Sequence, residues 1–414
     1  MRKMKDSGIE WIGEIPEGWE VVPVKRLCTM QAGKNLTSEQ IAPEGTYPVY
    51  GGNGIRGFFS DYNCDGQFLT VGRQGALCGN VHKINGKVWA TEHAVITTPS
   101  SYTILDFLYY LLIGMDLNQY VSSTAAQPGL AVGMLLNLKT CYPCSTLEQT
   151  QISNYLNAKC SEIDTMLSRT LSSIEEYKKL KQAIITQAVT TGVHGEREMK
   201  NSKIEWVGNI PIDWNTIKLK YCTYIRARLG WKALKADEYV EIGFPFLSAF
   251  NIVNNTLQFT NSNYINQFRY DESPEIQLSN GDVLLVKDGA GIGKCAIVEN
   301  MPMPSTVNGS IAVVSVTNSL IPKYLYYYFL SKMFQQHIDL LKDGMGVPHL
   351  FQSDLKEIKI AFPSKDEQKE IADYLDGKCA EIDKLIAKKE QLVKELESYK
   401  KSLIYEVVTG KQEV

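Results

Sequence analysis

The stretch that decides the fold occurs twice, as EQTQISNYLNAKCSEID at residues 148–164 and as EQKEIADYLDGKCAEID at residues 367–383. Each copy begins with the glutamate of an S-x-x-E sequence, at Ser145–Glu148 and Ser364–Glu367, which is the capping-box pattern of a helix N-terminus. From each copy onward, apolar residues recur every three or four positions over about 40 residues, which predicts a helix of roughly 60 Å. The sequence therefore predicts two long, matched helices.

Two matched helices in one chain can bury their apolar stripes against each other. A single stripe of this kind would usually belong to a domain core or to a homodimeric coiled coil. The duplication favours an intramolecular antiparallel pair, because each helix then finds its partner within the same molecule. The alternative is that the helices pair with another chain.

A shorter repeat precedes each long one. Residues 9–16 read IEWIGEIP and residues 204–211 read IEWVGNIP, and each copy is followed by a further tryptophan. The segments between the repeats are mostly unlike each other, which indicates two similar frames around two different inserts. We expect the frame tryptophans to pack at the domain edges; they are Trp11, Trp19, Trp206 and Trp214.

The inserts are rich in short Val, Ile, Tyr and Phe runs separated by Gly and Asn turns, a pattern typical of β-strands. Each insert closes with an aromatic, helix-like segment, at residues 104–112 and 323–334. The predicted fold class is therefore α+β. It comprises two domains of mixed or antiparallel β-sheet with helices, each followed by a long helix, and the two long helices pair as an antiparallel coiled coil.

Composition places the chain among globular proteins. It has 414 residues, 44% of them hydrophobic and 21% charged, enough for more than one domain core. No apolar run reaches about 18 residues and the N-terminus lacks a secretory signal, so we expect a cytoplasmic protein without a membrane partner. The nine scattered cysteines indicate reduced thiols. The single CxxC pair, Cys141 and Cys144, is expected to mark a strand end and not a metal site.

Sequence motifs for independent catalysis are missing. The stretch 288–295, DGAGIGKC, resembles a phosphate loop but lacks its first glycine and its Ser or Thr, so we expect no nucleotide cofactor. The chain also contains no Asn-Pro-Pro-aromatic or Asp-Pro-Pro-aromatic tetrapeptide, no HExxH and no GxSxG. We therefore expect a chain that is not an enzyme by itself and that holds no cofactor or metal.

The stretch KDSGIEWIGEIPEGW at residues 5–19, its second copy after residue 200 and the paired Glu-Gln helices resemble the specificity subunits of type I restriction-modification systems. The resemblance covers essentially the whole chain. It implies that each variable domain reads one half of a bipartite site in double-stranded DNA, while the helix pair sets the spacing and docks two modification subunits. Those methyltransferase subunits would carry catalysis, and restriction (motor) subunits would carry ATP hydrolysis and cleavage.

The resemblance assigns names to the predicted parts. They are a first target-recognition domain at 1–143, a central helical spacer at 144–192, a second target-recognition domain at 193–363 and a C-terminal helical spacer at 364–414. Because the two inserts differ in sequence, we expect an asymmetric target.

Candidate DNA-binding residues follow from the chemistry of base reading, in which Arg pairs with guanine and Asn or Gln with adenine, from short loops. The candidates in the first insert are Lys34, Asn35, Asn53, Arg56, Arg73, Gln74 and Lys87. The candidates in the second insert are Arg226, Arg228, Lys232, Ser248, Asn251, Lys287 and Lys294.

The charge balance bears on the two rival functions. The chain has 43 basic and 46 acidic residues, so DNA affinity has to come from local clusters or from a partner. This argues against the first rival, a stand-alone DNA-binding regulator. The second rival is a coiled-coil adaptor whose inserts bind protein.

Overall fold

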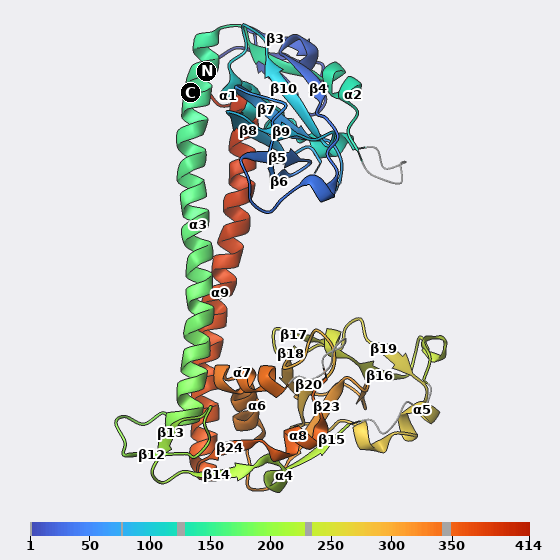
Figure 1. Cartoon of the computed structure of the whole chain (residues 1–414), viewed down its shortest axis with the longest axis vertical. Coiled ribbons are helices and arrows are strands. Elements are labelled where there is room, and N and C mark those ends of the chain that lie inside the picture. The colour runs from blue at the N-terminus through green and yellow to red at the C-terminus, as the bar shows by residue number, and fades with distance from the viewer. Residues whose placement is uncertain (1, 76–77, 122–128, 228–233, 342–348) are drawn as a thin grey trace. The chain divides into compact units, whose positions relative to one another are not determined.

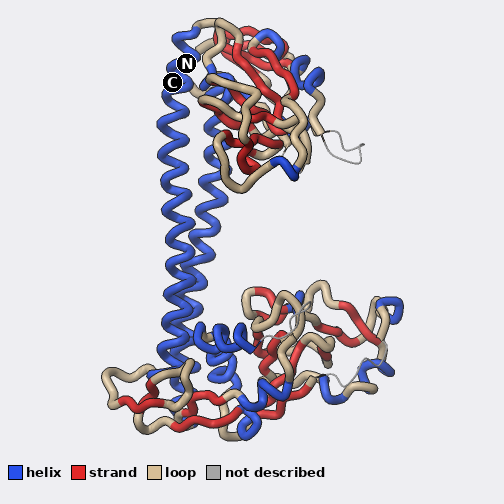
Figure 2. The backbone as a smooth tube through the Cα atoms, viewed as in Figure 1, coloured by secondary structure: helices blue, strands red, loops and turns tan. Residues whose placement is uncertain are grey.

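The computed structural model describes residues 2–75, 78–121, 129–227, 234–341 and 349–414. The chain divides into two compact units: unit 1 is Met1–Leu171 with Glu390–Val414, and unit 2 is Ser172–Lys389. Each unit contains a β-rich domain and one segment from each of the long helices α3 (Thr146–Thr191) and α9 (Lys365–Val408). Figure 1 labels these elements, and Figure 2 shows the helices in blue and the strands in red.

Unit 1 is built around a four-stranded antiparallel sheet of order β4-β10-β7-β8. Its strands are β4 (Cys28–Ala32), β7 (Gln67–Gly72), β8 (Val81–Asn85) and β10 (Ala94–Pro99). A second sheet, β6-β5-β9, contains β5 (Tyr47–Gly51), β6 (Gly54–Phe59) and β9 (Trp89–Ala90). Two strand pairs complete the β-structure: β1 (Met4–Asp6) with β2 (Glu14–Pro16), and β3 (Trp19–Pro23) with β11 (Lys139–Pro143). The short helices are α1 (Leu105–Gly114) and α2 (Val132–Asn137).

Unit 2 repeats this plan. Its four-stranded antiparallel sheet has the order β15-β23-β20-β21, from β15 (Thr223–Arg226), β20 (Val283–Val286), β21 (Cys295–Ile297) and β23 (Ile311–Val316). The second sheet, β19-β16-β22, contains β16 (Phe244–Leu247), β19 (Asn263–Ile265) and β22 (Thr306–Val307). The strand pairs are β12 (Met199–Asn201) with β13 (Asn209–Pro211), β14 (Asn215–Lys218) with β24 (Lys359–Phe362), and β17 (Ile252–Val253) with β18 (Thr256–Leu257). The short helices are α4 (Leu219–Cys222), α5 (Gln267–Asp271), α6 (Pro322–Leu330), α7 (Lys332–Leu341) and α8 (Gln352–Glu357).

The two domains therefore share one topology although their sequences differ. In both, the strands of the four-stranded sheet occur in the same spatial order, and a strand of the second sheet pairs in parallel with a two-residue strand, β5 with β9 and β16 with β22. The predicted α+β class with an internal repeat is confirmed.

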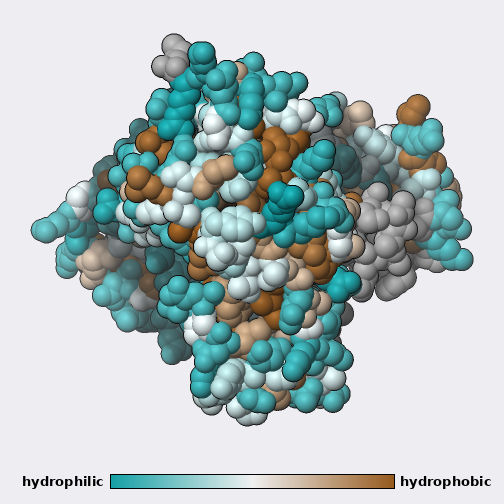
Figure 3. All heavy atoms as spheres, turned by 90° about the horizontal axis from the view of Figure 1, so that it is seen from above, coloured by the Kyte–Doolittle hydropathy of each residue, from teal (hydrophilic) through white to brown (hydrophobic). Residues whose placement is uncertain are grey.

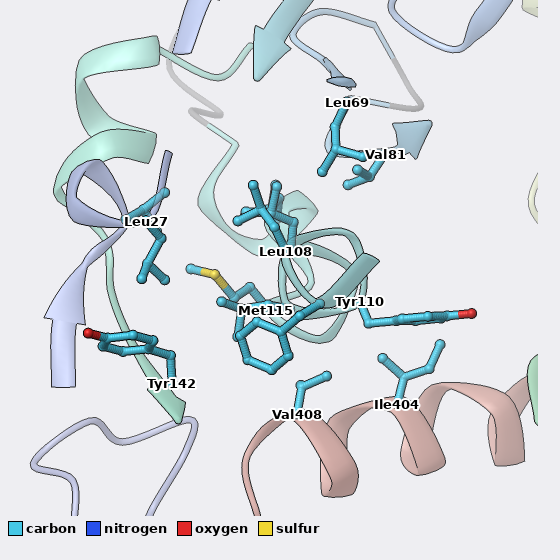
Figure 4. Close-up of a cluster of buried hydrophobic side chains, with 14 of the residues drawn as sticks. Leu27, Leu69, Val81, Leu108, Tyr110, Met115, Tyr142, Ile404 and Val408 are labelled. Atoms are coloured by element: carbon cyan, nitrogen blue, oxygen red, sulfur yellow. The ribbon is translucent and has the colours of Figure 1, made fainter. Parts of the chain in front are cut away.

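The core of unit 1 joins the β-domain to the long helices. Leu108 and Tyr110 of α1 belong to one buried cluster with Ile404 and Val408 of α9. Figure 4 shows Ile404 and Val408 extending from α9 toward α1, with Tyr110 beside Ile404, whereas Leu108 lies on the side of α1 that faces Leu69. Burying an aliphatic or aromatic side chain of this size is worth about 1.5–3 kcal/mol, so this contact fixes the domain to the helix.

The long helices pair in antiparallel fashion inside each unit. In unit 1, Leu156 near the start of α3 is buried with Leu403 near the end of α9. In unit 2, Ile185 near the end of α3 is buried with Leu375 near the start of α9. The predicted intramolecular pair is thus confirmed.

Two ion pairs between the helices occupy equivalent places. Lys400 Nζ lies 2.6 and 2.7 Å from the two carboxylate oxygens of Asp164, and Lys181 Nζ lies 2.8 and 2.6 Å from those of Asp383. Both aspartates are the last residues of the duplicated stretch. The repeated aspartate therefore makes the same inter-helix contact in each unit.

The repeated glutamates join the long helices to the frame. The backbone N–H groups of Glu148 and Glu367 donate to the capping serines, as the S-x-x-E pattern predicts. Their carboxylates, however, accept from the indole Nε1 of Trp19 at 3.2 Å and of Trp214 at 2.8 Å. Both tryptophans are buried, so their predicted packing role is confirmed. Each glutamate also forms a salt bridge with one arginine: Arg2 in unit 1 and Arg197 in unit 2.

The repeated glutamines explain why each β-domain keeps its place on its helix. Gln149 accepts a hydrogen bond from the Ile104 backbone N–H at 2.8 Å and donates to the Tyr102 carbonyl at 3.1 Å. Gln368 accepts from the Ile321 N–H at the same distance, 2.8 Å. Because Ile104 and Ile321 are the N-caps of α1 and α6, each glutamine ties a domain helix to the start of a long helix.

All nine cysteines are free thiols, as expected from their scatter. Cys141 is buried in β11 and Cys144 is exposed just beyond it. Burial raises the pKa of Cys141 to about 12, so this thiol stays protonated at neutral pH. The described residues contain no group of three or more His, Cys, Asp or Glu side chains that could hold a metal ion.

On the face drawn in Figure 3, hydrophilic and apolar side chains are interspersed. Within the described ranges, no helix combines the length and the apolar character that crossing a membrane requires.

Candidate nucleic-acid interface

Each domain has a corresponding edge at which a strand of each sheet ends. These strands are β7 and β5 in unit 1, and β20 and β16 in unit 2. In unit 1, the Arg73 N–H donates to the His93 carbonyl at 2.9 Å. In unit 2, the Lys287 N–H donates to the Ser310 carbonyl at 2.8 Å. We call this region the loop edge: residues 51–54, 73–75 and 78–80 in unit 1, and residues 248–251 and 287–294 in unit 2. Arg73 and Lys287 are therefore equivalent positions.

The residues that follow are also equivalent. Gln74 forms an isolated antiparallel bridge with Gly129, and Asp288 forms one with His349. The next residue in each loop is a glycine with positive φ, +91° at residue 75 and +81° at residue 289, and neither has a described atom within 4 Å of the Cβ position. Both backbones are thus open on the side where a ligand could approach.

Three candidates of unit 1, Asn53, Arg73 and Gln74, lie in its loop edge, and Lys34 lies beside it. Lys34 is exposed two residues after the end of β4, and its N–H donates to the Ala90 carbonyl at 2.9 Å. Asn53 is exposed at the tip of the β5–β6 turn. This turn lies against the loop that contains Gln74. The approach is so close that a side chain at Gly52 would place its Cβ only 2.7 Å from the Gln74 carbonyl oxygen. The structure thus brings together Lys34, Asn53, Arg73 and Gln74.

The other three candidates of unit 1 lie around or away from this edge. Asn35 follows Lys34 and is exposed, while the Arg56 side chain packs over Gly51 beside the turn. Lys87 lies at the opposite end of β7, with Nζ 4.4 Å from the centre of the Tyr62 ring. The hydrogen bond with Tyr62 raises the pKa of Lys87.

Three candidates of unit 2 lie at its loop edge. Lys294 is exposed, Lys287 donates to Asp288 Oδ2 at 2.8 Å, and Ser248 begins the turn after β16. Lys287 and Lys294 lie on the same loop, since the Val286 N–H donates to the Lys294 carbonyl at 2.8 Å.

The remaining candidates of unit 2 are not brought to this surface. The Arg226 guanidinium donates to Asp282 Oδ2 at 3.0 Å and to Ser315 Oγ at 2.8 Å, at the opposite end of β20. Asn251 is buried, and its amide group holds the turn together. Arg228 and Lys232 lie outside the described residues.

Asp288, in the loop edge of unit 2, and His349, which lies beside it, were not among the residues predicted from the sequence. The His349 imidazole pairs with the Asp288 carboxylate, and the His349 ring lies 4.6 Å from the Phe351 ring. The short repeat PGL at 128–130 and PHL at 348–350 is a signal that could have identified the bridging segment. In unit 1, burial lowers the pKa of His82 beside the turn, so this ring adds no positive charge near pH 7.

Comparison with known proteins gives matches along nearly the whole chain. The family model described as type I restriction modification DNA specificity domain matches residues 16–176 and 211–397, once in each half. The EcoprrI specificity subunit of Escherichia coli is 40% identical over 161 residues, which are 38% of each chain. The MjaVIII specificity subunit of Methanocaldococcus jannaschii is 26% identical over 96% of this chain and 93% of its own length.

The fold agrees with these matches. A chain from a solved structure on complex assembly and conformational transition of the type I R-M system aligns with a TM-score of 0.71 at 14% identity, over 96% of this chain and 99% of that one. Because the family model covers most of the sequence, the resemblance seen in the repeats is confirmed. The chain belongs to the family of type I restriction-modification DNA specificity subunits.

Proposed function

We propose that the chain reads a bipartite, asymmetric DNA site, with one half read at the loop edge of each domain, and that it has no catalytic role of its own. The observation that carries this proposal is the loop edge itself, which is built twice on one backbone plan and furnished with different side chains. A shared backbone suits a shared task, whereas different side chains suit different base sequences.

The side chains of the two edges have distinct base preferences. In unit 1, Arg73 has the forked donors that suit guanine, and Gln74 has the amide that suits adenine. In unit 2, Asp288 stands at the position of Gln74. Its carboxylate, which pairs with Lys287 and His349 in the free chain, is an acceptor and suits the cytosine amino group. Lys34 and Lys294, both exposed, supply contacts to phosphates. The target should therefore have two unlike halves.

The long helices are the proposed docking surface for two modification subunits, which would supply the methyl donor and catalysis, with restriction subunits joining in the full complex in the cytoplasm. Large apolar side chains are exposed at matching positions of the duplicated helices. Unit 1 exposes Met166 and Tyr399, and unit 2 exposes Leu385 and Leu180 at the equivalent positions. Two equivalent surfaces suit two copies of one partner.

A domain exchange tests this function. Residues of about 20–142 are replaced by the corresponding insert of another specificity subunit, and the methylated motif is mapped across a genome that expresses the chain with its modification subunits. We expect one half of the motif to change while the other half stays. A motif that changes in both halves would mean that the two inserts form one composite site.

A further inference from the structure

Phe250 is an aromatic side chain that the fold holds out in solvent. It is 93% exposed at the tip of the turn after β16. The turn is well anchored: the Asn251 side chain, in a residue 6% exposed, accepts from the Ser248 N–H at 2.9 Å and donates to Ser262 Oγ at 3.1 Å. Single exposed apolar residues are common on proteins. A phenylalanine on a turn fixed by a buried amide is nevertheless presented in a defined position.

The position of Phe250 is equivalent to that of Asn53. Leu247 pairs in parallel with Val307, as Tyr50 pairs with Ala90. Phe250 follows Leu247 by the same number of residues as Asn53 follows Tyr50. The tip of this turn therefore carries an exposed amide in unit 1 and an exposed phenyl ring in unit 2.

The loop next to the ring carries one exposed lysine and one lysine that is paired with Asp288. The turn lies beside the 287–294 loop, since a Cβ on Gly291 would lie 3.7 Å from the Ala249 Cβ. This loop carries Lys287 and the exposed Lys294. An apolar tip beside a loop that carries an exposed lysine suits a polyanion that also offers an apolar group.

We propose that Phe250 is a specificity-determining residue that contacts the 5-methyl group of a thymine in the major groove of the second half-site. The inference rests on the proposed reading of one half-site by each domain. The thymine methyl is the apolar group on the major-groove edge of the bases, and apolar side chains recognise it by contact. At this position unit 1 has the Asn53 amide, which can form hydrogen bonds, whereas unit 2 has the Phe250 ring, which can contact a methyl group.

The experiment uses the full chain in complex with its modification subunits and an unmodified duplex that carries the sequence of the recognition motif. Affinity is measured for this duplex and for duplexes in which each thymine of the second half-site is replaced in turn by deoxyuridine, which lacks only the methyl group. With the wild-type chain, we expect one replacement to weaken binding about fourfold, as befits the burial of one methyl group. Phe250→Ala should weaken binding of the unmodified duplex about tenfold and remove the effect of that replacement.

Controls separate the possible failures. Ile242 is 91% exposed in the same domain, before β16, so Ile242→Ala should leave both affinities unchanged. Unaltered melting of Phe250→Ala would show that the fold is intact. If scrambling the second half-site does not weaken wild-type binding, the proposed function fails. If scrambling weakens binding but Phe250→Ala binds like the wild type, or if every deoxyuridine replacement is neutral, the assignment of Phe250 is overturned.

Discussion

Gln368 offers a quantitative test of how each β-domain is held on its helix. Its side chain is buried, accepts from the Ile321 N–H at 2.8 Å, and donates to the carbonyls of Ser319 at 3.2 Å and Pro363 at 3.0 Å. Gln368→Ala leaves the Ile321 donor without its partner, which costs about 1–3 kcal/mol, and removes packed side-chain atoms. We expect a total loss of about 3 kcal/mol in the unfolding free energy of unit 2.

The assay is urea unfolding of the full chain, followed by a probe placed in each unit, because the two units can unfold separately. Gln149→Ala removes the same bonds in unit 1 and should give a loss of similar size there. Gln391→Ala is the control for the unit 1 probe, since this glutamine is exposed on the part of α9 that belongs to unit 1 and its loss should change stability by less than about 0.5 kcal/mol. A loss below about 0.5 kcal/mol for Gln368→Ala would refute the claim that the repeated glutamines hold each β-domain on its long helix.

Three further outcomes are expected. Arg73→Ala should cost about 1–3 kcal/mol in DNA binding and relax one base position, whereas a uniform loss over all sequences in binding assays would make Arg73 a phosphate contact. Lys181→Ala should cost about 0.5 kcal/mol in urea unfolding, because its ion pair with Asp383 is partly solvent-exposed; a loss above about 2 kcal/mol would contradict this. Hydrogen bonds from Lys218 and Lys220 lower the pKa of Glu357 to about 2. The stabilisation that the Glu357 carboxylate gives to the folded chain should therefore be present above its unfolded pKa near 4.5 and be lost as pH falls through about 2. NMR titration of Glu357 in the wild-type chain, and acid unfolding of Glu357→Gln compared with the wild type, check this. A Glu357 pKa near 4.5 in the folded chain would contradict it.

The helix pair could be predicted because its signals are local. Capping serines, an apolar stripe and a recognisable duplication all lie within short stretches, and the observed starts at Thr146 and Lys365 follow the predicted caps directly. The roles of Glu148 and Gln149 could not be predicted, since their partners Trp19 and Ile104 lie far away in the sequence.

The loop edge was harder to predict for the same reason. Arg226 has the side chain of a base reader, but its partner Asp282 is brought to it only by the pairing of β15, β23 and β20. The equivalence of Gln74 and Asp288 likewise depends on strand register, because the inserts have diverged in sequence. Phe250 was missed because a search for hydrogen-bond donors excludes an apolar side chain.

The measurement that tests the central claim most directly is a genome-wide methylation map for Gln74→Asp. This substitution gives unit 1 the carboxylate that unit 2 carries at the equivalent position. We predict that one base position in one half of the motif changes, from a base that suits an amide to one that suits a carboxylate, while the other half stays as in the wild type. An active complex whose motif is unchanged, or changed in both halves, would contradict the claim that each loop edge reads its own half-site.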